Sequence, residues 1–166
     1  MSLIDRYLCK AIDAYPYNLE DVIENLEYAL SSDNNNAATL CLYGRVYAEQ
    51  LHDYAMAKTY FQEALAADIH SVTVYPYFIQ LSIDFDEDKE AEKLIDFALT
   101  VKGIDKPLIL SKLILLKEKQ MLYKEVKHNI KKLKSIVLND DYQHFIDKTE
   151  ARIKEKKKVK GIAITR

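Results

Sequence analysis

The sequence predicts an all-α protein built from about four helix pairs and one further helix. Three observations lead to this prediction, and two of them concern composition. The chain of 166 residues contains 3 glycines and 3 prolines, fewer turn residues than a sheet protein of this size needs. Apolar residues make up 49% of the chain, so a folded core is expected rather than a disordered polymer.

The third observation is a triplet of apolar residues that recurs along the chain. Within each triplet the residues are spaced by four and then three positions, which places them on one stripe of a helix. The last members of successive triplets lie 35, 34 and 35 residues apart, a period typical of stacked helical repeats. The triplets are Val22, Leu26 and Ala29; Ala57, Phe61 and Ala64; Ala91, Ile95 and Ala98; and Val126, Ile130 and Leu133.

A partner helix is expected just upstream of each triplet. Before the second and third triplets, four residues form a stripe of their own at steps of three, one and three. Gly44 belongs to the first of these stripes. Because glycine inside a helix costs about 1 kcal/mol relative to alanine, close packing against the neighbouring helix is the expected reason for it. The two stripes are Leu40, Tyr43, Gly44 and Tyr47, and Tyr75, Phe78, Ile79 and Ser82.

These stripes and triplets resemble the tetratricopeptide repeat, a pair of antiparallel helices of about 34 residues. Residues 37–70 match that pattern best, with one extra residue in the turn around Leu51 and His52. In this repeat Leu40 replaces the usual tryptophan and Ile69 the usual proline.

The other repeats match less fully. Residues 72–105 carry Ile79 where the family has glycine, and residues 3–36 and 107–140 match in their second helices. The resemblance implies a right-handed α-solenoid that forms a single domain over residues 1–157. It ends in a capping helix at 141–157, followed by a flexible basic tail at 158–166.

Residues at the expected helix ends support this division. Five polar residues can each cap the start of a helix with a side-chain oxygen. Gly103 is expected to end a helix, whereas Pro76 and Pro107 fit the first turn of one, where a missing N–H costs nothing. The five expected caps are Asn18, Asn36, Asp53, Asp86 and Asp105.

The residue types that catalysis needs are not gathered by the sequence. The four histidines are scattered, and no glycine-rich phosphate loop, zinc-binding helix motif or nucleophile elbow occurs. Two cysteines, Cys9 and Cys41, are too few for a disulfide framework or a thiolate metal site. We therefore expect no enzyme activity, catalytic residue, metal, cofactor or small-molecule substrate.

The N-terminus does not read as a signal peptide, because Asp5, Arg6 and Lys10 interrupt any apolar run. No stretch approaches the 18 apolar residues of a membrane span. We therefore expect a cytoplasmic, reduced protein without a membrane partner. The oligomeric state is left open.

The family resemblance implies a concave groove that binds a peptide or protein segment, lined by the first helix of each pair. The chain is then a non-catalytic interaction module of the scaffold, adaptor or chaperone type. Arg6, Lys10 and Arg45 would give the groove a local positive charge that favours an acidic peptide or a chain-terminal carboxylate. The expected lining residues are Arg6, Lys10, Cys41, Arg45, Ala48, Glu49, Gln80, Asp84, Ser111 and Leu115, with Glu118 on the same face.

An uneven charge distribution supports an alternative. Residues 1–100 hold 6 basic and 18 acidic residues, whereas residues 101–166 hold 18 and 8. Such polarity can steer partners or drive head-to-tail association. The alternative function is a nucleic-acid-associated adaptor that uses the basic C-terminal third, although no aromatic residues interleave its lysines to stack on bases. Its densest patch is Lys154, Lys156, Lys157, Lys158 and Lys160.

Overall fold

The regular structure of this protein is helical throughout. The computed structural model describes residues 3–164, with side chains for residues 6–158. Within this range there are nine α-helices, one π-helix and no strand. The all-α prediction is confirmed. The helices divide between two compact units, Met1–Ile104 and Asp105–Arg166, while the expectation of a single domain over 1–157 stays a prediction.

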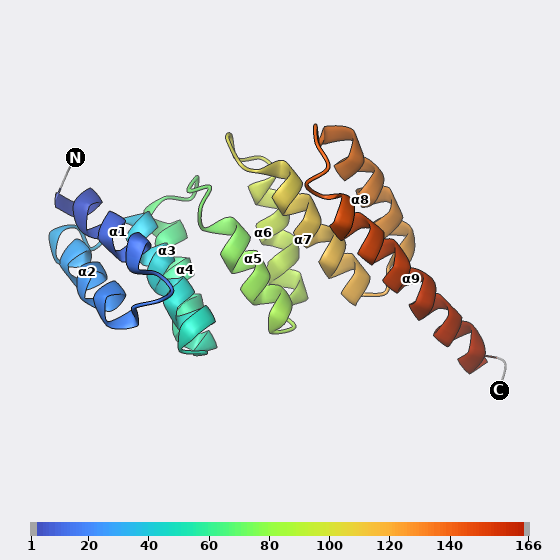
Figure 1. Cartoon of the computed structure of the whole chain (residues 1–166), viewed down its shortest axis with the longest axis horizontal. Helices are drawn as coiled ribbons and strands as arrows, with labels where there is room; N and C mark the ends of the chain where they lie inside the picture. Colours follow the sequence, from blue (N-terminus) through green and yellow to red (C-terminus); the bar gives the residue numbers. More distant parts are fainter. Residues whose placement is uncertain (1–2, 165–166) are drawn as a thin grey trace. The chain divides into compact units, whose positions relative to one another are not determined.

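The first unit contains three helix pairs (Figure 1). Within each pair the two helices pack against each other, and α2 also contacts α3 while α4 contacts α5. Consecutive pairs are therefore neighbours in space. The pairs are α1 (Leu3–Ala14) with α2 (Leu19–Ser32), α3 (Ala37–Arg45) and the π-helix η1 (Val46–Gln50) with α4 (Tyr54–Ala67), and α5 (Tyr75–Asp84) with α6 (Asp88–Ala98).

The second unit contains one helix pair and a long final helix. Helix α7 (Lys106–Lys119) packs against α8 (Tyr123–Ile136), and α9 (Gln143–Ile164) completes their core. The helix expected at 141–157 thus begins two residues later and runs to Ile164. The buried core of this unit is Leu110, Ile114, Val126, Ile130, Leu133, Ile146 and Ile153.

The predicted triplets lie in the core of every second helix. All twelve residues, in α2, α4, α6 and α8, are at most 2% exposed. The first-helix stripes are buried as well, except that Tyr47 is half-buried. The spacing of four and three therefore identified the packing face of each second helix correctly.

Gly44 allows a close approach between α3 and α4. A Cβ atom at this position would lie 2.6 Å from Cε1 and 2.7 Å from Cδ1 of Phe61 in α4. The Phe61 ring is fully buried and stacks on Phe78 of α5, with ring centroids 5.6 Å apart. Because the ring is held on its other side, it has little room to move. Close packing is confirmed as the reason for this glycine.

Four of the five expected caps are confirmed. Side-chain oxygens of Asn18, Asn36, Asp53 and Asp105 accept hydrogen bonds from backbone N–H groups at 3.3, 3.0, 3.1 and 2.9 Å. Pro76 and Pro107 lie in the first turns of α5 and α7, as expected.

Two expectations about helix ends are wrong. Asp86 does not cap α6: its φ angle is +60°, so it forms the turn, and Glu87 takes the cap position without a capping side-chain bond. The Glu87 carboxylate instead accepts hydrogen bonds from Nζ of Lys58 in α4. Gly103 does not end α6, which stops at Ala98; it adopts a φ of +85° in the turn before α7.

The extra residue of the second repeat lies inside the helix rather than in the turn after it. Residues Val46–Gln50 form the π-helix η1, and the backbone N–H of Leu51 donates to the carbonyl of Val46, five residues earlier, at 3.0 Å. A π-helical turn holds one more residue than an α-helical one. The extra residue is thus absorbed before the chain reaches Asp53, the cap of α4.

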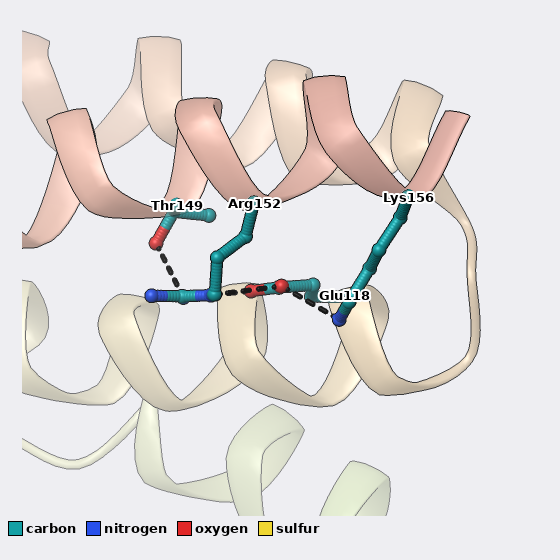
Figure 2. Close-up of polar contacts among 4 residues, drawn as sticks. All are labelled: Glu118, Thr149, Arg152 and Lys156. Carbon is teal, nitrogen blue, oxygen red and sulfur yellow. Dashed lines mark hydrogen bonds and ion pairs between the residues drawn. The ribbon is translucent and has the colours of Figure 1, made fainter. Parts of the chain in front are cut away.

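A buried carboxylate fastens α9 to α7 (Figure 2). Glu118, 4% exposed, accepts hydrogen bonds from Nε and Nη2 of Arg152 at 3.0 and 2.8 Å and from Nζ of Lys156 at 2.8 Å. Arg152 also donates to the hydroxyl of Thr149 at 3.0 Å. Burial alone would raise the pKa of Glu118, but these hydrogen bonds outweigh it and lower the pKa.

We expect Gly44→Ala to lower the free energy of unfolding by about 1–2 kcal/mol. The gain in helix propensity is outweighed by the overlap between the new methyl group and the ring of Phe61. Urea denaturation measures the change. In a Phe61→Leu background, where the ring is absent, the same substitution should cost clearly less. Equal costs in both backgrounds would show that the contact between these residues does not explain the glycine.

Glu118→Gln should destabilise the protein by about 1–3 kcal/mol at neutral pH, because it removes the charge that Arg152 and Lys156 neutralise. The control Glu155→Gln removes an exposed pair with Lys158 and should cost under about 0.5 kcal/mol. Because folding lowers the pKa of Glu118, the stability difference between the wild type and Glu118→Gln should reach its full size above the unfolded-state pKa of about 4.3. It should vanish as the pH falls through the folded-state value. A pH-independent difference in thermal melts would contradict this assignment.

Candidate functional site

The residues expected to line the groove occupy different environments. Arg6 and Lys10 are exposed on α1, whereas Cys41 in α3 and Ser111 in α7 are buried. The others, Arg45, Ala48, Glu49, Gln80, Asp84 and Leu115, are exposed or half-buried. Ser111, Leu115 and Glu118 belong to the second unit, so only the first unit brings several of the expected residues together.

Arg45 is the centre of that group. Its guanidinium carbon lies 4.6 Å from the ring centroid of Tyr15 and 4.2 Å from that of Tyr77. Its Nε donates to Oε1 of Glu49 at 3.2 Å, and the Tyr15 hydroxyl donates to Oε2 of the same carboxylate at 2.5 Å. We call Tyr15, Arg45, Glu49 and Tyr77 the Arg45 cluster.

The Arg45 cluster combines residues from all three helix pairs of the first unit. Tyr15 follows the end of α1, Arg45 ends α3, Glu49 lies in η1 and Tyr77 lies in α5. The cation–π contacts fix the plane of the guanidinium, and the ion pair fixes its rotation. The arginine is therefore held in one orientation, with its side chain 24% exposed.

The electrostatics of the Arg45 cluster differ from the expected positive site. The charge of Arg45 is balanced by Glu49. Burial alone would lower the pKa of Arg45, but the hydrogen bond and charge of Glu49 raise it above its usual value. Burial and the hydrogen bond to Glu49 raise the pKa of Tyr15 to about 12, so it stays a neutral donor at physiological pH.

Arg6 and Lys10 do not join the Arg45 cluster. Among the described residues, no hydrogen bond, ion pair or ring contact links either of them to its members, and Nζ of Lys10 lies 5.6 Å from the ring centroid of Tyr7. One turn beyond Tyr77, Gln80 donates to Asp84 at 2.7 Å and extends the polar surface along α5.

Cys41 lies in the packed interior rather than on an open face. It is 4% exposed, and its Sγ lies 3.6 Å from the carbonyl oxygen of Thr73, in the segment that leads to α5. Burial raises the pKa of its thiol to about 12. The residue packs between the second and third helix pairs. The spacing of residues within α3 does not predict this burial, because the covering segment lies outside that helix.

Sequence reasoning did not identify either tyrosine of the Arg45 cluster. Tyr77 carried a usable signal, because positions 77, 80 and 84 follow the helical steps of three and four and so share a face with Gln80 and Asp84. Tyr15 carried none, because it follows the last residue of α1 and has no periodic neighbours.

A second surface feature is a groove of about 500 Å³ between α8 and α9. Five lysines line it above an apolar floor formed by Ile130 and Ile153. One acidic residue, Glu150, also lines it and pairs with Lys134 at 3.5 Å. We call this feature the lysine groove. Its lysines are Lys127, Lys131 and Lys134 of α8, and Lys154 and Lys157 of α9.

The lysine groove uses only part of the predicted basic patch. Lys156 turns toward Glu118, and Lys158 pairs with Glu155 at 2.9 Å. The Lys160 side chain lies outside the described residues. The contribution of α8 was missed, although Lys127, Lys131 and Lys134 follow the same four-and-three spacing as the buried triplet, one residue later.

Within the described part of the chain, no group of three or more histidine, cysteine or acidic side chains is placed to hold a metal ion. No helix there is both long enough and apolar enough to cross a membrane. No protein-family model and no curated protein sequence matches the chain.

A thiol reagent should modify one cysteine of the native protein. Cys9 is exposed on α1, whereas Cys41 is buried and its thiol stays protonated. We expect mass spectrometry to find a single adduct on Cys9 under native conditions and two adducts in denaturant. Cys9→Ser should abolish the native reaction. Rapid native labelling of Cys41 would contradict its placement in the interior.

Proposed function

We propose that this protein is a non-catalytic interaction module, a tetratricopeptide-like α-solenoid that holds a segment of a partner protein. The proposal is supported by four helix pairs whose second helices bury equivalent triplets at spacings of 35, 34 and 35 residues. Stacked helix pairs with this period form extended surfaces that suit the binding of protein segments.

The main support for a binding function is the arrangement of residues in the Arg45 cluster. Arginine and tyrosine are enriched among the residues that dominate binding energy at protein interfaces. Here two tyrosine rings and a carboxylate orient the arginine in advance, so binding need not pay the entropy of ordering it. Because three successive helix pairs contribute, a segment that crosses the pairs would meet the Arg45 cluster.

The same contacts indicate the chemistry of the segment. In the described contacts, Nε is the guanidinium nitrogen that donates to Glu49, which leaves the terminal nitrogens to bind a carbonyl or carboxylate oxygen. Since Glu49 offsets the charge of Arg45, shape and hydrogen bonding contribute more than net charge. The expected preference for acidic peptides therefore loses its main support at this position.

The nucleic-acid alternative has weaker support. The lysine groove supplies positive charge, but the residues that line it include neither an aromatic side chain nor an arginine. Aromatic stacking on bases and forked arginine contacts are the usual means of holding single strands and reading base edges. The lysines of the groove would offer only point charges to phosphates.

Arg45→Ala and Arg45→Lys test the proposal. Immobilised wild-type and variant proteins are incubated with extract of the source cells, and retained proteins are quantified by mass spectrometry. A partner should bind the wild type and lose at least about tenfold in affinity with Arg45→Ala, measured by calorimetry on the purified partner. Arg45→Lys should fail similarly, because lysine keeps the charge but not the planar stacking.

The matched control is Lys89→Ala, which removes an exposed cation of α6 that no hydrogen bond, ion pair or ring contact among the described residues links to the Arg45 cluster. Thermal melts establish that each variant is folded. If both Arg45 variants retain the same partners as the control with equal affinity, the Arg45 cluster is not the binding surface.

A further inference from the structure

The two units of this protein carry opposite charges. Residues 1–104 hold 7 basic and 18 acidic residues, a net charge of −11, whereas residues 105–166 hold 17 and 8, a net charge of +9. Five of these basic residues line the lysine groove around a floor of two isoleucines, together with the acidic Glu150. Of these lysines, Lys127, Lys131 and Lys154 form no ion pair with any described residue.

A matching negative feature lies on α2. Glu20, Glu24 and Glu27 are all exposed and are spaced by four and three residues. Each precedes a member of the buried triplet Val22, Leu26 and Ala29 by two positions, so the glutamates lie on the opposite, outer side of the helix. We call these three glutamates the acidic stripe.

The acidic stripe is not explained by contacts within the described chain. No ion pair among the described residues involves any of its three members. Favourable interaction with the helix dipole accounts for Glu20, in the first turn, but not for Glu24 and Glu27 farther along α2. These charges are free to meet a cationic surface.

The lysines of α8 repeat the spacing of the acidic stripe. Lys127, Lys131 and Lys134 are also four and three residues apart, so both sets extend over about 10 Å of helix at 1.5 Å per residue. Lys154 and Lys157 face them from α9 across the lysine groove. A helix laid along it would have cations on both sides.

We propose that the lysine groove of one copy of this chain binds the acidic stripe on α2 of a second copy. The contact joins two different surfaces, so it is heterologous, and each pair keeps one free groove on one copy and one free stripe on the other for further neighbours. Charge complementarity favours this occupant, because the chain itself supplies a negative helix of the same spacing. The lining lacks the aromatic residues that would favour a single-stranded nucleic acid.

The contact depends on exposed charges, so it should weaken with salt. The Debye length falls from about 10 Å at 0.1 M salt to about 3 Å at 1 M. Sedimentation velocity of the purified full chain over a range of concentrations should therefore show association at about 50 mM NaCl and mostly monomer at about 500 mM NaCl. Concentration dependence separates this contact from one within a single chain.

Charge reversal identifies the two surfaces. The groove variant carries Lys127→Glu, Lys131→Glu and Lys134→Glu, and the stripe variant carries Glu20→Lys, Glu24→Lys and Glu27→Lys. Each alone should associate at least about tenfold more weakly than wild type. Mixed together they should associate again, because the intact stripe of the groove variant can bind the intact groove of the stripe variant and the two reversed surfaces are also opposite in charge.

The control variant carries Lys124→Glu, Lys132→Glu and Lys148→Glu. It makes the same change in net charge at exposed lysines outside the lysine groove, and it should associate like wild type. Circular dichroism verifies the folding of every variant. If a charge-reversed variant loses helical signal, glutamine replaces the reversed residues, and association should still weaken.

Three results would overturn the proposal. They are a wild-type monomer at every concentration in low salt, equal weakening by the groove and control variants, and a mixture that does not pair. Binding of random-sequence duplex DNA by a monomeric wild type, lost in the groove variant, would assign the lysine groove to phosphate backbones instead. Binding of a poly-glutamate peptide by that monomer would assign it to a foreign acidic segment.

Discussion

The structure depends on how closely the two helices of each pair can approach. At the second pair the approach is so close that no side chain fits at position 44, where a methyl group would overlap the ring of Phe61. That ring in turn stacks on Phe78 of the next pair, so one contact fixes the spacing within a pair and the next fixes the spacing between pairs. The small members of the triplets, such as Ala57 and Ala64, serve the same purpose along α4.

Much of the fold could be predicted from the sequence because it follows from periodicity. The triplets, the two first-helix stripes, four caps and both prolines obey local rules of helix geometry, and the structure bears them out. The failures at Asp86 and Gly103 have one cause. Both residues have positive φ angles, so they form turns, and a cap or stop residue cannot be told from a turn residue by type alone.

The candidate site was harder to predict because it is assembled between helices. The register separated Arg45 from the buried packing stripe of α3, but it did not identify the tyrosines that hold the arginine or show that Glu49 balances its charge. It also placed Cys41 and Glu118 on an open face. Cys41 is covered by the segment that leads to α5, and Glu118 by the side chains of α9. Contacts of this kind join residues about 30 or more positions apart, which periodicity within one helix does not report.

The π-helical turn at Val46–Gln50 changes how the length of a repeat should be understood. It takes up the additional residue where the backbone widens, so the connection from Leu51 to Asp53 stays short and Asp53 can still cap α4. The extra residue is therefore compensated within the helix itself. The residues after it face the directions that they would have in a pair one residue shorter. A pair of 35 residues can in this way stack beside one of 34 without a longer loop. Insertions in such a chain need not appear at the turns, where they are usually sought. The residues whose directions a widened turn alters are those in it and next to it, here Glu49 inside η1 and Arg45 just before it.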